Sequence, residues 1–428
     1  MFGTLRGMPT AVRVSRGATA APRAAYIHVP FCAHRCGYCS FTVVAGRDDL
    51  VPRYLAALAR ELSSLATPRP VDTLFIGGGT PTRLAPDALE HLLSVVARWF
   101  PLAAGGEFTV EANPSDLDAD RVAVLAGQGV TRVSLGGQSF NPAKLRVLER
   151  DHQAADIARA IERVRPHVNS VSLDLIFAAP GETLDGWQAD LAAALALQPD
   201  HVSTYGLTYE RGTTFWNRRQ RGELANLDEE LERSMYAAAI DTLVAAGFEH
   251  YEVSNFARQI IDRKIASSEN PSPLGRGQGE GQEGCEAIFR SPAGHRCRHN
   301  EVYWAGEAFY AAGPGAARYV NGCREMNHRS TTTWLNRVLA GQSPVAETET
   351  LSPEDRAREM LVFALRRLEG IARADFTQRT GLDIDALVGP ELRRYVELGL
   401  LTDDSRGVRL TREGLFVSDG IWPRFLRR

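Results

Sequence analysis

Hydrophobic and polar positions follow two regular patterns from residue 25 onward. Short apolar runs predict strands, and between them lie longer stretches whose apolar residues recur every three or four positions, as in helices with one buried face. The stretch 50–65 shows the second pattern, with an apolar face of Tyr54, Leu55, Leu58, Leu62 and Leu65. Further helices are predicted at 86–99, 184–197 and 228–246, and strands at 25–30, 71–76, 107–112, 130–135, 170–177 and 201–207.

Six strand–helix units in series predict a parallel sheet, which forms either an incomplete barrel or an open, doubly wound sheet. Polar or glycine-rich sequence follows each of the first four strands, and Asp174 lies within the fifth. An open sheet gathers its site at one switch point, whereas a curved sheet brings many successive strand ends together. The sequence therefore favours an α/β fold in which residues 25–256 form an incomplete (β/α)6 barrel.

The rest of the chain departs from this pattern. Residues 257–296 contain a run rich in Gly, Pro and Ser that cannot bury a core, so we expect a disordered, looped-out insertion. Residues 297–345 are expected to cap the barrel. In 346–428, a helix start at Ser352-Pro353-Glu354-Asp355 precedes helices and two short strands at 400–402 and 408–411. This order predicts a winged-helix-like α+β domain that serves as a structural or partner-binding cap.

Composition and charge narrow the classes of function. The formal net charge of −3 and the 24% of charged residues are ordinary for a globular protein, and they do not indicate binding to nucleic acid through bulk charge. No apolar run is long enough to cross a bilayer. Residues 1–24 contain four arginines and no Asp or Glu, and we expect a disordered extension there. Mitochondrial transit peptides share this composition, so the mitochondrion is the alternative to an expected cytoplasmic location.

Three of the six cysteines, Cys32, Cys36 and Cys39, stand close together with the spacing C-x3-C-x2-C. Clustered cysteines in a long chain indicate a metal site in a reducing compartment. An iron–sulfur cubane needs four ligands, so three cysteines leave one iron open to chelate the amino and carboxylate groups of S-adenosylmethionine. The alternative, a structural zinc site, usually has four protein ligands in paired spacing. We expect the remaining three, Cys285, Cys297 and Cys323, to be bystanders.

The cysteine motif resembles that of the radical S-adenosylmethionine (radical SAM) superfamily. The preceding Tyr26-Ile27-His28-Val29-Pro30-Phe31 resembles one branch of it, the oxygen-independent coproporphyrinogen III oxidases and HemW heme chaperones. The resemblance covers residues 25–256 and resumes from residue 297 to the C-terminus. It implies a 4Fe-4S cluster on the three cysteines and a bound S-adenosylmethionine. The residues that it implies for S-adenosylmethionine are Tyr26, Tyr38, Ser40, Gly78, Gly79, Thr80, Glu111, Gln138, Arg150, Asp174 and Gly206.

Taken singly, these residues also have structural interpretations. The Gly77–Thr82 motif is a glycine-rich turn without the Gly-Lys-Ser/Thr ending of a P-loop, Tyr26 fits a strand core, and a lone Glu or Arg fits a salt bridge at the barrel rim. The cofactor interpretation is preferred because the polar positions follow the cysteines in the order that the family shows.

Two functions from different classes remain: a heme chaperone, and an oxidase that decarboxylates two propionates of coproporphyrinogen III through a 5′-deoxyadenosyl radical. The oxidases resemble C-x3-C-x2-C-x-C, and here Phe41 stands at the last cysteine position, which favours the chaperone. His299-Asn300-Glu301-Val302-Tyr303-Trp304 resembles an H-N-x-x-Y-W motif linked to heme binding, which implies His299 as a heme contact. The alternative is a core histidine.

The resemblance also implies partners, namely heme, heme-accepting proteins and an electron-donor protein. Two segments depart from the family pattern and put the details of the pocket in doubt. These segments are Ala178-Ala179-Pro180-Gly181 and Ala311-Ala312-Gly313-Pro314-Gly315-Ala316-Ala317.

Overall fold

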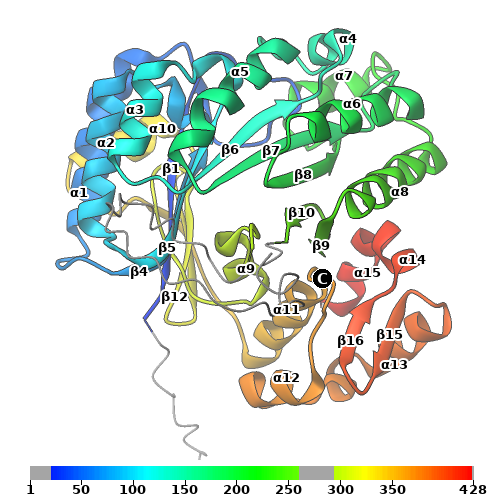
Figure 1. Cartoon of the computed structure of the whole chain (residues 1–428). Helices are drawn as coiled ribbons and strands as arrows, with labels where there is room; N and C mark the ends of the chain where they lie inside the picture. Colours follow the sequence, from blue (N-terminus) through cyan, green and yellow to red (C-terminus); the bar gives the residue numbers. More distant parts are fainter. Residues whose placement is uncertain (1–20, 260–293, 427–428) are drawn as a thin grey trace, which may run out of the picture.

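Six parallel strands form the centre of the main sheet in a computed structural model that describes residues 21–259 and 294–426 (Figure 1). Neighbouring strands pair in parallel from the first to the last, and no pairing closes the circle between β8 and β1. The prediction of an incomplete (β/α)6 barrel is therefore confirmed. The strands are β1 (Ala24–Val29), β4 (Val71–Gly78), β5 (Leu102–Ala112), β6 (Arg132–Gln138), β7 (Ser170–Phe177) and β8 (His201–Gly206).

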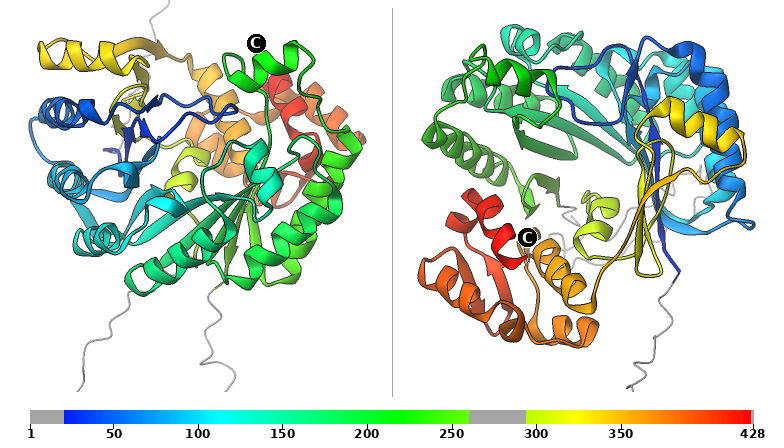
Figure 2. Two further views of the ribbon diagram at one scale, coloured as in Figure 1. Left: turned by 90° about the horizontal axis from the view of Figure 1, so that it is seen from above. Right: turned by 180° about the vertical axis from the view of Figure 1, so that it is seen from behind.

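Helices cover the outer face of this sheet and enclose it in an arc, as the view from above in Figure 2 shows. Their apolar faces and the outward-facing strand residues form one large buried cluster. Tyr54, predicted on the apolar face of the first helix, is fully buried and donates its hydroxyl to the His28 carbonyl at 2.8 Å. The helices are α1 (Val51–Ser63), α2 (Pro86–Trp99), α3 (Ala119–Gly127), α5 (Ala154–Val164), α6 (Leu184–Ala196) and α8 (Glu229–Ala245).

Three further strands extend the sheet at its two edges, and the sequence pattern did not predict them. On one edge β11 (Tyr310–Ala312) pairs in parallel with β1. On the other edge β10 (Asn255–Arg258) pairs antiparallel with β8, and β9 (Phe248–Glu252) pairs antiparallel with β10. These strands are short, and their hydrogen bonds depend on the tertiary fold.

Two predicted segments lie largely outside the described residues, namely the extension in 1–24 and the insertion in 257–296. At the edge of the extension the prediction needs correction, because Arg23 forms an ion pair with Asp72 at 2.6 Å and Ala24 begins β1. The bounds of the predicted insertion also need correction, because Arg258 ends β10 and the His295 amide donates to its carbonyl at 3.3 Å.

The chain after residue 294 packs against the open side of the barrel, beginning with α9 (Arg298–Trp304). A small antiparallel sheet follows in the order β12 (Ala317–Val320), β13 (Cys323–Asn327), β14 (Val345–Thr350). The helix α10 (Thr331–Leu339) packs on α1. Buried Glu61 joins α1 to this region, because its carboxylate accepts hydrogen bonds from Gly313, Asn327 and Trp334.

The C-terminal part has its own buried core and the α+β composition of the predicted winged-helix-like domain. In Figure 1 it lies below the barrel strands. Ion pairs join it to α8, between Arg233 and Glu413 at 2.8 Å and between Arg412 and Asp241 at 2.7 Å. Its elements are α11 (Pro353–Leu365), α12 (Arg373–Thr380), α13 (Ile384–Glu397), β15 (Leu401–Asp404), β16 (Gly407–Leu410), α14 (Arg412–Phe416) and α15 (Ser418–Phe425).

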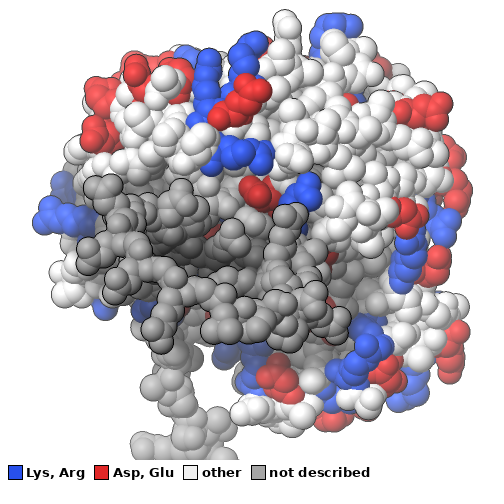
Figure 3. Space-filling model, in the orientation of Figure 1, with Lys and Arg blue, Asp and Glu red and all other residues white. Residues whose placement is uncertain are grey.

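The surface in Figure 3 mixes positive and negative side chains over the visible part of the described chain. This mixture agrees with the small formal net charge of −3. Among the described residues, no helix combines the length and the apolar character that a membrane span requires.

Candidate cluster and cofactor site

A cavity of about 410 Å³ opens at the carboxyl ends of the central strands. Parallel strands that curve together present their carboxyl-end residues to one space, so residues far apart in sequence meet there. Most of the predicted site residues line this cavity. They are Cys32, Cys36, Tyr38, Cys39, Ser40, Gly78, Gly79, Thr80, Glu111, Gln138, Arg150, Asp174 and Gly206.

The cysteine loop lies between β2 (Phe31–Cys32) and β3 (Val44–Ala45), which pair in parallel. Glu149 holds the middle of this loop: its carboxylate accepts the Gly37 amide at 2.7 Å, and the Cys36 thiol points to its carbonyl at 3.7 Å. On the other side, the Phe215 amide at the start of α7 (Thr214–Gln220) donates to the Gly37 carbonyl at 2.8 Å. A Cβ at Gly37 would lie 2.4 Å from the Phe215 ring, so any larger residue would have to displace that ring.

The chemistry of the three thiols fits an iron–sulfur cluster. Burial raises the pKa of Cys32 to about 12 and also raises the pKa of Cys39, so both thiols need nearby positive charge to ionise. Iron supplies that charge, because metal binding deprotonates its cysteine ligands. Within the described ranges, no three His, Cys, Asp or Glu side chains converge as ligands of a single ion. A cubane spreads its thiolates over separate irons, and cysteines along one cavity wall suit that arrangement.

Arg150 contributes a guanidinium with incomplete hydrogen bonding to the cavity wall. One end of its guanidinium donates to Gly136 and Asn113, each at 3.0 Å, and another nitrogen points to Cys36 Sγ at 3.7 Å. Its buried Nε has no hydrogen-bond partner among the described residues. A buried donor without a partner is rare in folded proteins, and a guanidinium is suited to a carboxylate. The arrangement fits the amino-acid carboxylate of S-adenosylmethionine.

Two buried carboxyl groups face the same cavity. Glu111 accepts the Gly78 amide at 2.9 Å, yet burial dominates and raises its pKa to about 7. Burial also raises the pKa of Asp174, against the opposing effect of hydrogen bonds from serines that include Ser134 at 3.0 Å. A ligand with amino or hydroxyl donors would satisfy these carboxyl oxygens.

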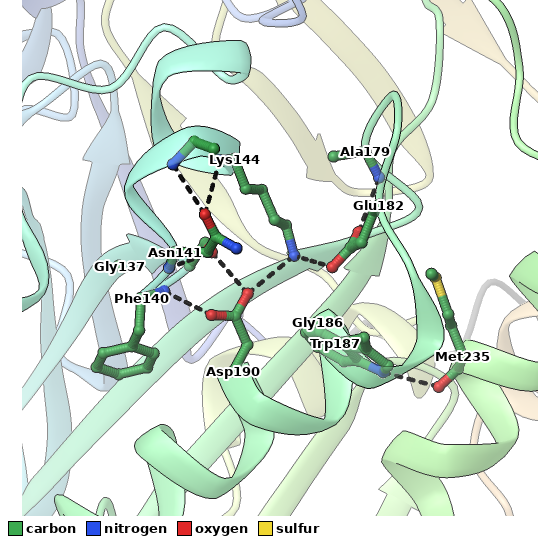
Figure 4. A network of polar contacts seen from close by, with 12 residues as sticks. Gly137, Phe140, Asn141, Lys144, Ala179, Glu182, Gly186, Trp187, Asp190 and Met235 are labelled. Carbon is green, nitrogen blue, oxygen red and sulfur yellow. Dashed lines mark hydrogen bonds and ion pairs between the residues drawn. The ribbon is translucent and has the colours of Figure 1, made fainter.

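A buried ionic network holds the chain between Gln138 and Arg150. Gln138 ends β6 with a φ of +62°, a conformation that is unfavourable for a residue with a Cβ. Just after it, Asp190 of α6 accepts the Ser139 hydroxyl at 2.6 Å and the Phe140 amide at 2.7 Å. Figure 4 shows the Lys144 amino group between Asp190, at 3.1 Å, and Glu182, at 2.5 Å. Lys144 lies in α4 (Pro142–Val147), and the network therefore ties the loops after β6 and β7 together.

Two predicted site residues do not line this cavity. Tyr26 lines a neighbouring cavity and hydrogen-bonds to His28 Nδ1 at 3.0 Å. His299 is 1% exposed, with Nδ1 at 2.9 Å from the Thr73 hydroxyl and Nε2 at 2.8 Å from the Tyr303 hydroxyl. Burial lowers its pKa to about 3, so the ring is neutral. Both ring nitrogens have hydrogen-bond partners within the protein. These are the surroundings that a core histidine would have.

Three residues that shape the site were not predicted from the sequence: Asn113, Glu149 and Lys144. Asn113 and Glu149 each stand beside a predicted contact, Asn113 two residues after Glu111 and Glu149 just before Arg150. Lys144 had a different signal. The chain has 49 Lys and Arg residues, and all except Lys144 and Lys264 are arginines. Lysine is therefore rare in this chain, and that rarity is the sequence signal at Lys144.

Comparison with known proteins shows two matching domain families. Residues 26–194 match the radical SAM superfamily, and residues 351–417 match the HemN C-terminal domain. The radical SAM match implies a 4Fe-4S cluster and S-adenosylmethionine.

Relatives match over nearly the whole chain. The heme chaperone HemW of Bacillus subtilis is 32% identical over 94% of this chain and 99% of its own length. The heme chaperone HemW of Mycobacterium tuberculosis is 35% identical over 82% of this chain and 84% of its own. A bovine protein, the mitochondrial radical S-adenosyl methionine domain-containing protein 1, is 33% identical over 95% of this chain and 87% of its own.

Among solved structures, the Escherichia coli coproporphyrinogen III oxidase HemN aligns with a TM-score of 0.77. HemN is 21% identical to this chain, and the alignment covers 95% of this chain and 90% of HemN. At this identity the alignment shows a shared fold.

Proposed function

Because the chain belongs to the family of HemW heme chaperones within the radical SAM superfamily, we propose that it binds heme and delivers it to partner proteins. The observation that carries this proposal is the match to the B. subtilis HemW over 94% of this chain and 99% of the relative. Both ends of the architecture, the cluster loop and the C-terminal domain, are therefore shared with a heme chaperone.

We further propose that Cys32, Cys36 and Cys39 hold the 4Fe-4S cluster, with S-adenosylmethionine beside it. Support comes from the three thiols that line the cavity and from the unpartnered Nε of Arg150, whose guanidinium lies beside Cys36. Arg150 would orient the cofactor carboxylate, and Glu111 and Asp174 would accept hydrogen bonds from its amino and hydroxyl groups. When bound, the cluster supplies one-electron chemistry to S-adenosylmethionine.

Position 41 supports the chaperone over the oxidase. Phe41 lies two residues after Cys39 and is 62% exposed, although it is a large aromatic residue. Phe41 therefore places an apolar surface in the wall of the cluster cavity. The motif of the family's oxidases has a further cysteine at this position. The structural likeness to HemN does not favour the oxidase, because it shows the fold alone.

The remaining parts of the proposal concern partners and location. A one-electron donor protein is needed to reduce the cluster, and a heme-accepting protein is needed for delivery. Cysteines that hold an iron–sulfur cluster must stay reduced, so we propose a reducing compartment, the cytoplasm. The mitochondrial alternative rests on the composition of residues 1–24, of which residues 1–20 lie outside the described residues.

The experiment compares heme binding with oxidase activity in the same preparation. The full chain is reconstituted with iron and sulfide without oxygen, and then it is titrated with hemin and assayed with coproporphyrinogen III, S-adenosylmethionine and a reductant. We expect a saturable change in the Soret band and no protoporphyrinogen IX. Conversion at enzymatic rates would refute the chaperone assignment, and so would the absence of hemin binding.

A further inference from the structure

A second cavity lies beside the cluster cavity, and Phe41 belongs to the walls of both. Its volume is about 350 Å³, within the range of small-molecule sites. The walls come from β1, from the cysteine loop, from α9 and from the chain between Phe309 and Arg329. The lining residues are Tyr26, His28, Phe41, Thr42, Tyr303, Phe309, Gly315, Ala316, Ala317, Met326 and Arg329.

Aromatic rings form much of this lining, and one of them is held firmly. The rings of Tyr303 and Phe309 meet edge to face, with centroids 4.7 Å apart. The Tyr303 hydroxyl is fixed by His299 Nε2 at 2.8 Å. Phe41 remains 62% exposed, which leaves one apolar surface for a ligand. Rigid aromatic walls of this kind favour a planar, apolar ligand.

Small residues keep the space between these rings open. Gly315 has a φ of +72°, and a Cβ on it would lie 2.4 Å from the Thr42 hydroxyl oxygen. Ala316 and Ala317 follow it along the same wall. Ala317 is a position at which this segment departs from the family pattern, and its side chain there is only a methyl group.

Arg329 is the one formally charged side chain among the lining residues. His28 is neutral, because burial lowers its pKa to about 4, and its two nitrogens bind the Tyr26 hydroxyl and the Thr42 carbonyl. Arg329 donates to the Ser40 carbonyl at 2.9 Å, and no carboxylate pairs with it among the described residues. The cavity therefore combines apolar walls with one cation that has donors to spare.

We propose that this second cavity is the heme site, with the macrocycle against Phe41 and Tyr303 and a heme propionate on Arg329. The inference deepens the proposed function and rests on it. A tetrapyrrole has the required chemistry, since it is a flat apolar ring whose carboxylates lie at one edge. In this site His299 acts as a positioning residue that orients Tyr303, and the iron needs no bond to it. Phe41 also lines the cluster cavity, and Arg329 donates to the carbonyl of Ser40 in its wall, so heme lies next to S-adenosylmethionine.

The test separates the propionate contact from the ring contact. The cluster-loaded full chain is titrated without oxygen with hemin and with hemin dimethyl ester, whose propionates carry no charge. We expect Arg329→Gln to weaken hemin binding about 10-fold, as for loss of a hydrogen bond to a charged group, and to leave the ester unchanged. Arg337→Gln, a matched change on α10 outside the cavity lining, should alter neither affinity.

Phe41→Ser provides a second, independent variant. Loss of its ring should weaken hemin and the ester equally, by about 3- to 10-fold. An unchanged electron paramagnetic resonance spectrum of the reduced cluster in both variants would show that the cysteine loop is intact. If the wild-type protein binds hemin and both variants bind it equally well, the cavity assignment is overturned while the chaperone function stands. If the wild-type protein does not bind hemin, the proposed function itself fails.

Discussion

Replacing Lys144 by methionine tests whether the buried ionic network stabilises the barrel. The Lys144, Glu182 and Asp190 side chains are only 6%, 4% and 2% exposed. Among the described residues, Lys144 is the one cation paired with both carboxylates of this network, at 2.5 Å from Glu182 and 3.1 Å from Asp190. Methionine keeps a similar length and volume, so the substitution removes the charge without leaving a large cavity.

The magnitude follows from burial. Removing one partner of a buried ion pair strands the other charge in a medium that solvates it poorly, which costs about 3–5 kcal/mol of unfolding free energy. Burial already raises the pKa of Glu182 despite the adjacent Lys144, which indicates how poorly its charge is solvated. By contrast, the exposed pair between Arg412 and Asp241 contributes only about 0–1 kcal/mol. Arg412→Met is therefore the matched control.

The assay is urea unfolding of the cluster-free chain, followed by far-ultraviolet circular dichroism. Lys144→Met should lose about 3–5 kcal/mol, and Arg412→Met about 1 kcal/mol or less. Adding Glu182→Gln and Asp190→Asn to Lys144→Met removes the stranded charges and should restore most of the loss. The reasoning is refuted if Lys144→Met alone is as stable as the control, or if the triple variant is less stable than the single one.

Three further predictions concern the cluster and cofactor cavity. Cys32→Ala should abolish bound iron and sulfide per chain, whereas Cys323→Ala, distant on β13, should retain both; equal iron contents would contradict the cluster assignment. Arg150→Lys should weaken S-adenosylmethionine about 10-fold in calorimetry, because an ammonium lacks the guanidinium fork, and an unchanged affinity would remove Arg150 from the contact. The pKa of Glu111 in the folded state, about 7, lies above its free value of 4.5, so its contribution to stability is full below pH 4.5 and is lost as the pH rises through 7. Between pH 5 and pH 8 the cofactor-free wild type should therefore lose up to about 3 kcal/mol more than Glu111→Gln, and parallel pH profiles in urea titrations would count against this pKa.

The central strands were predictable because their apolar runs are long and end at polar residues. The strand predicted at 170–177 coincides with β7, whose residues are buried on both faces except for Asp174. The edge strand β11 has three residues, Tyr310–Ala312, in a segment rich in Ala and Gly. Its extended conformation depends on hydrogen bonds to β1, and no local pattern specifies those bonds.

The cavity residues were accessible to sequence reasoning because they follow strand ends within recognisable motifs. The Lys144 network was not, since its members lie 38 and 46 positions apart and each resembles an ordinary charged surface residue. His299 shows the same limit. His299 could be a heme contact or a core histidine, and its hydrogen bond to Thr73 decides between these interpretations. Thr73 is 226 positions away, and only the folded chain brings the two side chains together.

The position of β11 beside β1 also has a consequence for how the protein is made. A ribosome adds roughly 5–20 residues per second, and β11 is encoded about 280 residues after β1. The first strand and the cysteine loop behind it therefore leave the ribosome roughly 15–60 s before their outer neighbour has been synthesised. During that time β1 is an edge strand with unpaired backbone N–H and C=O groups, and such a strand is prone to pair with a non-native strand. Cluster insertion into the nascent chain would meet a binding loop that is still open on one side, whereas insertion after release must pass through the finished cavity.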